Sequence, residues 1–598
     1  MNGLRASKRV NWVPAFAGMT VLIGAWIAAL PGARAAETSA DAKFKAIYTK
    51  EWEWRKEQYS IRDEEDTRES LPDHLPKADA AAEAARLEYW MGVLKEVDAV
   101  PRDQLSPEVQ VDYDVYRPQI AALIADEQFR DYEMPVNSDS SFYSDITETA
   151  RGDFKTAADY HNYVKWLSDI PRFFREETDD MRAGLKRGFT PPRVTMAGRD
   201  KAIAAVAEAK PEESVFLEPF KKNTLNIPDA EWNALRADAL KQIQASVIPA
   251  YRDLLQFMRN DYIPGTRATL AAEALPDGKA YYRSKILEFT TLDMDPAQIH
   301  QIGLSEVATI HQKMVEEMQK TGFKGSFADF LKYLRSDPKF YVTEPDELLR
   351  RAAWIAKKFD GKASTYFGLL PRSRFTIKPV PPDIAPFYTA GRGGPGVYLL
   401  NTYELKSRPL YNLTALTLHE SAPGHAFQIP LADERKDMPD FRRMSYISAY
   451  GEGWALYCER LGVEMDMYDT PYDMFGMWGY QIWRAARLVV DTGIHSQGWT
   501  REQAIDYLRE NTALPEREIG TEVDRYISWP GQALSYYLGE MSILKARAKA
   551  EKALGPKFSL RAFHDTVLQM GSVPLPVLEA RIDRFIVEGG KGPYPDLE

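Results

Sequence analysis

Apolar residues recur at three- and four-residue spacing over most of the chain, which is the period of an amphipathic helix. The clearest example is the stretch 80–97, and similar patterns recur at 160–188 and 229–262. Proline clusters separate these stretches, as expected where helices end. The amino-terminal part of the chain, from about residue 41 to about residue 301, is therefore predicted to be a series of helices.

The pattern changes in the middle of the chain. Segments 374–380 and 397–401 are rich in β-branched and aromatic residues, as strands are, and a glycine-rich segment, 391–396, lies between them. A phosphate-binding glycine loop follows a strand and opens a helix, whereas this segment runs into a strand. It is therefore predicted to be a flexible loop beside a small sheet. Helical patterning resumes after Ser407, so we expect a mainly α fold with one small β-element near 372–401.

Length and charge narrow the architecture. The chain has 598 residues, about four times the length of a typical domain, so two or more lobes are expected. No repeat or low-complexity linker marks a boundary. We place an N-terminal helical lobe at 36–300 and a catalytic helical lobe at 301–598. The net charge of -11 argues against a nucleic-acid partner, which needs a basic face.

The first 35 residues are typical of a secretory signal peptide. Three basic residues precede an apolar run at 19–30, and the small residues of Ala33-Arg34-Ala35 follow it. The run is shorter than a membrane span requires, and the only cysteine, Cys458, is too far away to carry a lipid. We expect residues 1–35 to be removed and the mature protein to be periplasmic or secreted. An uncleaved amino-terminal anchor is the alternative.

Two closely spaced histidines form the main candidate site, because a chain with one cysteine must bind metal through histidine and carboxylate. In the familiar zinc motif the histidines are four apart on one helical face. His419 and His425 are six apart, and such positions point about 120° away from each other on a straight helix. Pro423 and Gly424 lie between them and can break a helix. We predict that a helix running from Pro409 through His419 bends there and returns His425 to the same ion.

The chemistry of a zinc site suggests the remaining members. Two histidines and one carboxylate leave the fourth position of zinc open for water, and Glu420 could accept the proton of that water. Glu452 and Glu459 are seven residues apart, two helical turns, and share one face. We predict that Glu452 is the third ligand and that Glu459 is a hydrogen-bond partner of a ligand histidine. The alternative is two surface histidines beside a turn and a solvated glutamate face.

Peptide hydrolysis also needs groups that contact the substrate. His495 and Tyr536 are candidate donors to the oxyanion of a tetrahedral intermediate. Arg484 or Arg487 could pair with the terminal carboxylate of a peptide, although internal salt bridges are the alternative. We also predict that the strand containing Tyr398 has an exposed edge that binds an extended peptide through its backbone.

Two sequence motifs resemble those of a known family. Residues 419–428 read HExxPGHxxQ, and residues 452–459 read EGWALYxE. With these motifs the sequence resembles the bacterial family called domain of unknown function 885. A further matching segment is 529–536, within which Gln532 is a candidate substrate-binding residue. One departure is Tyr537, where the family often has lysine. The resemblance implies a gluzincin-like metallopeptidase with an all-helical, clefted fold similar to those of thimet oligopeptidase and angiotensin-converting enzyme.

These observations favour a zinc-dependent peptidase with one Zn2+ that hydrolyses short or unfolded peptides, because a helical cleft excludes folded substrates. An amidase or carboxypeptidase acting on other amides is the first alternative, since the same zinc chemistry serves any amide. A non-catalytic periplasmic binding protein is the second, against which the presence of Glu420 counts.

Overall fold

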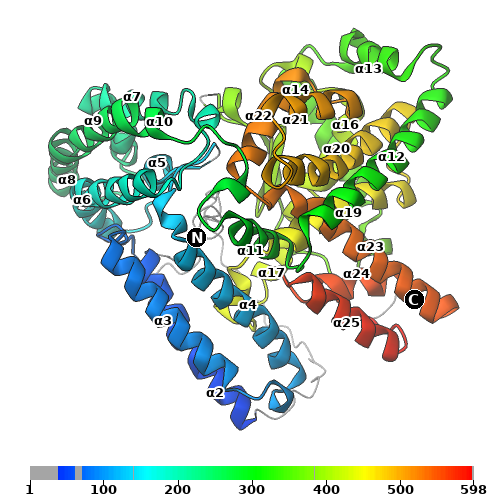
Figure 1. The fold of residues 1–598 in the computed structure, drawn as a ribbon, viewed down its shortest axis with the longest axis horizontal. Helices are drawn as coiled ribbons and strands as arrows, with labels where there is room; N and C mark the ends of the chain where they lie inside the picture. Colours follow the sequence, from blue (N-terminus) through cyan, green and yellow to red (C-terminus); the bar gives the residue numbers. More distant parts are fainter. Residues whose placement is uncertain (1–37, 61–69, 139, 383, 595–598) are drawn as a thin grey trace. The chain divides into compact units, whose positions relative to one another are not determined.

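The computed structural model describes residues 38–60, 70–138, 140–382 and 384–594. The predicted signal peptide, residues 1–35, lies outside them. The chain divides into two compact units, Met1–Ala268 and Thr269–Glu598. The described residues are mainly helical and contain one small three-stranded sheet (Figure 1). The predicted mainly α fold with one small β-element is confirmed.

Helices α2 to α10 build the first unit. The helices predicted from apolar periodicity at 80–97, 160–188 and 229–262 are all present. Two π-helical turns, Ile243–Val247 and Met258–Tyr262, join the last three helices into one continuous run. The helices are α2 (Ser39–Tyr59), α3 (Ala80–Asp98), α4 (Pro107–Phe129), α5 (Phe142–Arg151), α6 (Ala157–Arg187), α7 (Asp200–Ala207), α8 (Asp229–Gln242), α9 (Ile248–Phe257) and α10 (Ile263–Gly265).

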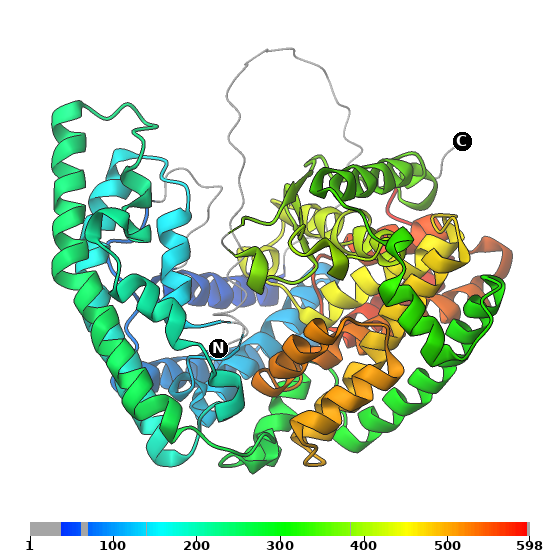
Figure 2. The same cartoon turned by 90° about the horizontal axis from the view of Figure 1, so that it is seen from above.

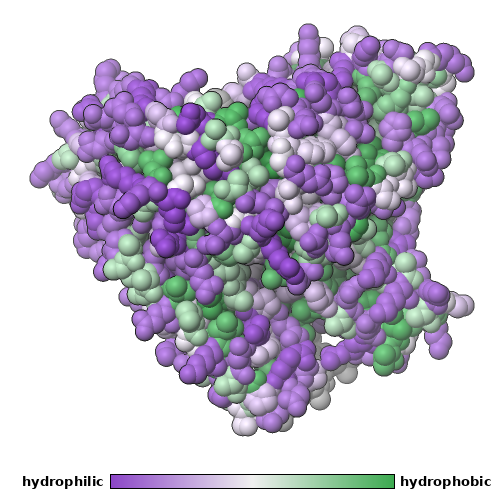
Figure 3. All heavy atoms as spheres, viewed as in Figure 1, coloured by the Kyte–Doolittle hydropathy of each residue, from purple (hydrophilic) through white to green (hydrophobic). Residues whose placement is uncertain are grey.

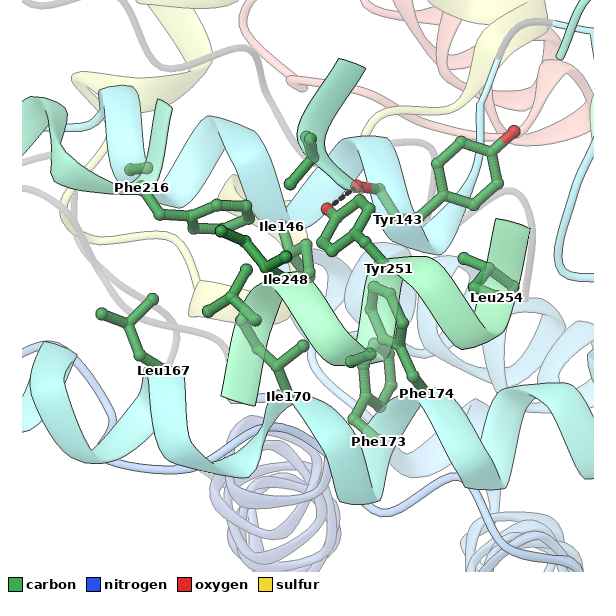
Figure 4. Packing of buried hydrophobic residues seen from close by; sticks show 14 of the residues in the cluster. Tyr143, Ile146, Leu167, Ile170, Phe173, Phe174, Phe216, Ile248, Tyr251 and Leu254 are labelled. Carbon is green, nitrogen blue, oxygen red and sulfur yellow. Dashed lines mark hydrogen bonds between the residues drawn. The ribbon is translucent and has the colours of Figure 1, made fainter. Parts of the chain in front are cut away.

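Aromatic and aliphatic side chains, many of them from α5, α6 and α9, form a hydrophobic core in the first unit (Figure 4). The rings of Phe174 and Tyr251 lie 4.9 Å apart, between centroids, and the Tyr251 hydroxyl donates to the carbonyl oxygen of Tyr143 at 2.6 Å. Burying the hydroxyl without such an acceptor would cost free energy. This unit contains none of the predicted site residues, which all lie in the second unit.

The second unit contains the remaining helices and the sheet. They are α11 (Gly278–Thr290), α12 (Pro296–Lys320), α13 (Phe327–Ser336), α14 (Pro345–Asp360), α15 (Ala363–Tyr366), β1 (Thr376–Pro379), β2 (Gly391–Gly394), β3 (Val397–Leu400), α16 (Leu410–Glu420), α17 (His425–Asp433), α18 (Asp440–Arg443), α19 (Ser448–Glu464), α20 (Pro471–His495), α21 (Arg501–Asn511), α22 (Glu516–Ser528), α23 (Ser535–Leu554), α24 (Leu560–Leu568) and α25 (Leu575–Val587).

Helix α20 is the centre of this unit. It packs against α12, α16, α19, α21, α22 and α23, and Figures 1 and 2 show it enclosed by these helices. From Phe475 to His495 all but one of its residues are buried, so apolar side chains occur on every face. Among them are buried polar side chains, including Arg484, Arg487 and Asp491, whose charges need partners inside the protein.

The small sheet has the strand order β1-β3-β2. β3 pairs in parallel with β1 and antiparallel with β2, with Tyr398 opposite Ile377 and Gly393. The glycine-rich segment that we predicted to be a flexible loop therefore forms an edge strand over residues 391–394. The β-propensity of its residues did not indicate this strand, because glycine has no side chain that favours one. Its position against α16 and α17 provides the packing instead.

The division into units lies before the boundary near residue 300 that the sequence led us to expect. Helix α11 packs against α19 and α23, and α12 packs along α20, so both helices belong to the second unit. On the face shown in Figure 3, hydrophilic residues predominate and hydrophobic ones are scattered between them. In the described part of the chain, no helix has both the length and the hydropathy needed to span a bilayer.

Candidate metal centre

The break that separates the two histidines lies where the sequence predicted it. Helix α16 begins after Pro409 and ends at Glu420, and α17 begins at His425. The Gly424 amide donates to the carbonyl oxygen of Leu418 at 3.0 Å, which folds the connection back on the last turn of α16. A Cβ at Gly424 would lie 1.8 Å from the carbonyl oxygen of His419. Only glycine permits this close approach, and it brings the two histidines together.

Three side chains converge at this break. His419 Nε2 lies 3.5 Å from Glu452 Oε2, and His425 Nε2 lies 3.3 Å from the same oxygen. The imidazole centroids are 5.0 Å apart, and the ring planes are nearly perpendicular at 86°. Among the described residues, this is the one group of three histidine, cysteine or acidic side chains whose ligand atoms all lie within 4.8 Å of one another.

The spacing fits a small divalent ion. For metal–ligand bonds of about 2.0 Å at tetrahedral angles, neighbouring ligand atoms lie about 3.3 Å apart. The two distances to Glu452 Oε2, 3.5 and 3.3 Å, are close to this value. Two imidazole nitrogens and one carboxylate oxygen are also the donor set of many catalytic zinc sites, which leave one position open. His419, His425 and Glu452 could therefore hold zinc.

Glu459 orients the first histidine. Its Oε1 lies 2.8 Å from His419 Nδ1, and both side chains are buried. Because a carboxylate only accepts hydrogen bonds, this contact keeps a proton on Nδ1, so Nε2 is the nitrogen that could bind a metal once it has lost its own proton. Glu452 and Glu459 are two turns apart on α19 and face α16 together, which is the arrangement predicted from their spacing.

Electrostatics couple the candidate ligands to one another. Burial disfavours the charged imidazole of His419, but hydrogen bonds to Glu452 and Glu459 outweigh it and raise the pKa of His419 to about 9. Burial disfavours the charged form of Glu452, but the nearby His425 and His419 lower the pKa of Glu452 well below its usual value. A proton thus compensates the buried carboxylates, and a metal ion would replace it.

Glu420, the predicted base, is held by the edge strand. The amide of Gly393 in β2 donates to Glu420 Oε2 at 2.7 Å. A Cβ at Gly393 would lie 1.6 Å from the carbonyl oxygen of Glu420, so the backbones of β2 and α16 are in direct contact. The carbonyl oxygen of Ala390 accepts from the backbone amide of Asn401, so residue 390 bonds toward β3. Residues along an antiparallel strand bond alternately toward and away from their partner strand, so the Gly393 amide points away from β3, toward the outer edge of the sheet. That edge therefore borders the histidine–glutamate cluster.

One residue of the centre had no indication in the sequence. The hydroxyl of Tyr446 donates to Glu452 Oε1 at 3.1 Å, and its ring centroid lies 6.3 Å from that of His425. Burial and the charge of Glu452 raise the pKa of Tyr446 well above its usual value, so the hydroxyl stays protonated. Gly451 leaves room for the Tyr446 ring, which a Cβ at that position would approach to 2.3 Å, but this contact is visible only in the structure.

The model of a family of bacterial proteins of unknown function, DUF885, matches residues 63–582. The chain belongs to DUF885. A solved structure from Colwellia psychrerythraea, described as a "putative lipoprotein", is 26% identical and has a TM-score of 0.83. The match covers 92% of this chain and 98% of the other.

A second solved structure, from Shewanella oneidensis, is described as a "putative lipoprotein of unknown function". It is 17% identical with a TM-score of 0.68, and the match covers 91% of this chain and 99% of the other. This second likeness shows the fold alone. A comparison with curated proteins finds no match.

Within this DUF885 chain, His495 lies elsewhere than predicted. It is fully buried at the end of α20, where Nδ1 accepts from the Ala272 amide at 3.1 Å. Its Nε2 donates to the carbonyl oxygen of Tyr526 at 2.8 Å. Both ring nitrogens thus join segments of the fold, and the predicted role as an oxyanion donor is wrong. A helix-end histidine in sequence does not reveal such partners.

The two candidate arginines are internal as well. Arg487 donates to Glu522 at 3.1 Å, and Arg484 stacks on Trp483 at 4.0 Å with its guanidinium 3.9 Å from Glu459 Oε1. Their side chains are 3% and 5% exposed, so they cannot pair with the terminal carboxylate of a peptide. The internal salt bridge that we kept as the alternative is what the structure contains.

The other predicted substrate residues have different outcomes. Tyr398 is fully buried in the central strand, so the prediction of an exposed edge there is wrong. Gln532 is buried, and its Oε1 accepts from Arg525 at 3.1 Å. Tyr536 is half-buried on α23, with its ring 4.3 Å from the guanidinium of Arg487. It stays a candidate donor.

Tyr537 is the position where the family often has lysine. Here the Tyr537 hydroxyl donates to Glu306 Oε2 at 2.7 Å. The tyrosine therefore still provides a donor to a carboxylate, although it carries no positive charge.

Proposed function

We propose that this protein is a zinc-dependent peptidase that acts outside the cytoplasm on short or unfolded peptides. The observation that supports this most directly is the convergence of the two histidine Nε2 atoms on Glu452 Oε2, next to a glutamate on the same helix end. Zinc, when bound there, supplies Lewis-acid chemistry that makes water nucleophilic near neutral pH.

The residues of the chain would divide the work. His419, His425 and Glu452 hold the ion. Glu420 Oε2 is bonded to the Gly393 amide, so Oε1 is the atom that takes a proton from the attacking water. As the water oxygen bonds to the scissile carbonyl carbon and the C–N bond breaks, Glu420 returns that proton to the leaving amine. Tyr536 is the candidate donor to the carbonyl oxygen.

Peptides in extended form are the proposed substrates because of burial. The side chains of His419, His425 and Glu452 are 2%, 8% and 15% exposed, so the surface of a folded protein cannot reach them. The outer edge of β2 borders the centre, and an extended backbone could pair with the groups of that edge other than the Gly393 amide, which Glu420 takes. This replaces the edge that we expected at Tyr398.

Export is supported by two observations. Residues 1–35 have the pattern of a signal peptide. The solved structure from Colwellia psychrerythraea, which is 26% identical, is described as a "putative lipoprotein". The only cysteine of this chain, Cys458, is buried in α19, so we propose a periplasmic or secreted protein that carries no cysteine-linked lipid.

The test combines metal analysis of the purified protein with turnover of a mixed peptide library read by mass spectrometry. Glu420→Gln should retain one zinc per chain and lose about 100- to 10,000-fold in turnover, because it removes the base but no ligand. His425→Ala should lose both zinc and turnover. The matched control is Glu510→Gln, an exposed glutamate on α21, which should change neither.

Each failure is informative. Cleavage by Glu420→Gln at the rate of the unaltered protein would overturn the assigned base. Zinc binding without any turnover of peptides would instead favour the non-catalytic binding protein. Turnover of other amides but not peptides would favour an amidase.

A further inference from the structure

Among the described residues, Tyr446 is the one outside the two motifs whose side chain is hydrogen-bonded to a candidate ligand. It lies between α18 and α19, in a segment fixed by the Ile447 amide, which donates to Ser572 Oγ at 2.8 Å. From there its hydroxyl reaches Glu452 Oε1 at 3.1 Å. The hydroxyl therefore takes one oxygen of the same carboxylate whose other oxygen faces the two histidines.

Packing holds the tyrosine ring in this position. Three of its ring and hydroxyl atoms lie 2.3 Å from the place where a Cβ on Gly451 would be, so the ring covers the first turn of α19. The ring also approaches His425, with centroids 6.3 Å apart and planes inclined at 63°. A ring confined on two sides keeps its hydroxyl at one point, so the hydrogen bond to Glu452 forms with little further loss of conformational entropy.

The division of the two carboxylate oxygens has a consequence for metal binding. A glutamate can bind a metal through one oxygen or through both. Here Oε2 lies 3.5 and 3.3 Å from the imidazole nitrogens, whereas Oε1 accepts the hydrogen bond from Tyr446. A second bond from Oε1 to the ion would compete with that hydrogen bond. It would also fill a position that water and substrate need.

We propose that Tyr446 is a positioning residue that keeps Glu452 bound to the metal through Oε2 alone. The proposal rests on the proposed metal site and adds a coordination number to it. With Tyr446 in place, the protein supplies three ligand atoms. Without the hydroxyl, Glu452 is free to turn and bind through both oxygens, which gives four protein ligand atoms and a more crowded ion.

The test replaces zinc by Co2+, whose visible absorption depends on coordination number. The purified protein, stripped of metal by a chelator, is titrated with CoCl2 as wild type and as Tyr446→Phe. The matched control is Tyr341→Phe, which removes a hydroxyl that donates to the carbonyl oxygen of Leu334 at 3.0 Å, far from the ligands in sequence. Zinc affinity is measured in parallel by competition with a chromophoric chelator.

We expect Tyr446→Phe to bind one Co2+ with weaker visible bands, because higher coordination lowers their intensity. We also expect its zinc affinity to fall about tenfold, in the range found when a partner of a metal ligand is removed. Tyr341→Phe should match wild type in both measurements. Gly451→Ala provides a second route, since its Cβ must displace the Tyr446 ring, and it should change the Co2+ spectrum in the same direction.

The outcomes separate the two proposals. If wild type binds one Co2+ and Tyr446→Phe has the same spectrum and zinc affinity, the positioning role is wrong and the metal site stands. If wild type binds no Co2+ at this centre, the metal site and the positioning role both fall.

Discussion

The helices α16 and α17 present their histidines in different ways. His419 lies in the last turn of α16, and a carboxylate from another helix, Glu459, contacts its Nδ1 at 2.8 Å. His425 is the first residue of α17, and its Nδ1 is buried without a hydrogen-bond partner among the described residues. The side-chain amide of Gln428, one turn along α17, is buried too and makes no hydrogen bond to His425.

Backbone contacts take the place of a side-chain partner at α17. The backbone amide of Gln428 donates to the carbonyl oxygen of Gly424 at 2.8 Å. Trp454 Nε1 donates to the carbonyl oxygen of Pro423 at 2.9 Å. The ring of His425 is thus directed by the position of its helix, whereas the ring of His419 is directed by a charged neighbour. Substitutions that remove a hydrogen-bonding side chain should therefore disturb mainly the ring of His419 on α16. Substitutions that change packing should disturb mainly the ring of His425 on α17.

The largest effect should follow from moving the end of α16 with a single methyl group. In Gly393→Ala the new Cβ would lie 1.6 Å from the carbonyl oxygen of Glu420, so β2 or α16 must shift. A displacement of about 1 Å at a reacting group can lower turnover about 100-fold. We expect a loss of that order in kcat on the peptide library, with zinc retained.

Gly394→Ala is the control within the same strand, because a Cβ there meets nothing within 4 Å. It should change kcat less than twofold. Equal losses in the two variants would mean that the strand as a whole, rather than its contact with Glu420, determines turnover.

A smaller effect should follow from removing the partner of one histidine. Glu459→Gln replaces a charged acceptor by a neutral one, and we expect the zinc affinity to fall about tenfold. Gln428→Leu, on the α17 side, removes an amide that makes no bond to His425, and the affinity should change less than threefold. Chelator competition measures both. A tenfold loss in Gln428→Leu would show that Gln428 supports His425 once metal is bound, and the contrast between the helices would disappear.

Much of this centre could be predicted from local sequence rules. Helical patterning after Ser407 indicated the region that contains α16 and α19, and a Pro-Gly pair between two histidines indicated the break. The seven-residue spacing of Glu452 and Glu459 then placed both carboxylates on one face of α19. These inferences succeeded because each depends on the chemistry of a few neighbouring residues.

The residues that could not be predicted depend on distant partners. β2 consists of three glycines and an arginine, so its strand conformation follows from pairing with β3 and not from propensity. Tyr446 reaches Glu452 from an irregular segment. His495 and Arg487 have the right chemistry for catalysis, but their partners Tyr526 and Glu522 lie on a later helix that sequence periodicity does not orient.

The smallest effect at the metal centre is expected from Trp454→Phe. Trp454 is fully buried, and its Nε1 donates to the carbonyl oxygen of Pro423, within the connection between the two histidine helices. The variant leaves that carbonyl unpaired in the protein interior, at a cost of about 1–3 kcal/mol. For a protein of 598 residues such a loss lowers the Tm by about 1–2 °C.

Trp478→Phe, at a half-buried tryptophan of α20, is the matched control and should lower the Tm less. Because the last turn of α16 and Glu459 are unaffected in Trp454→Phe, its zinc affinity should fall by no more than about threefold, less than in Glu459→Gln. If Trp454→Phe instead lost zinc as strongly as Glu459→Gln while its Tm stayed unchanged, the connection would not act through packing. The ring of His425 would then depend on a specific contact, as that of His419 does.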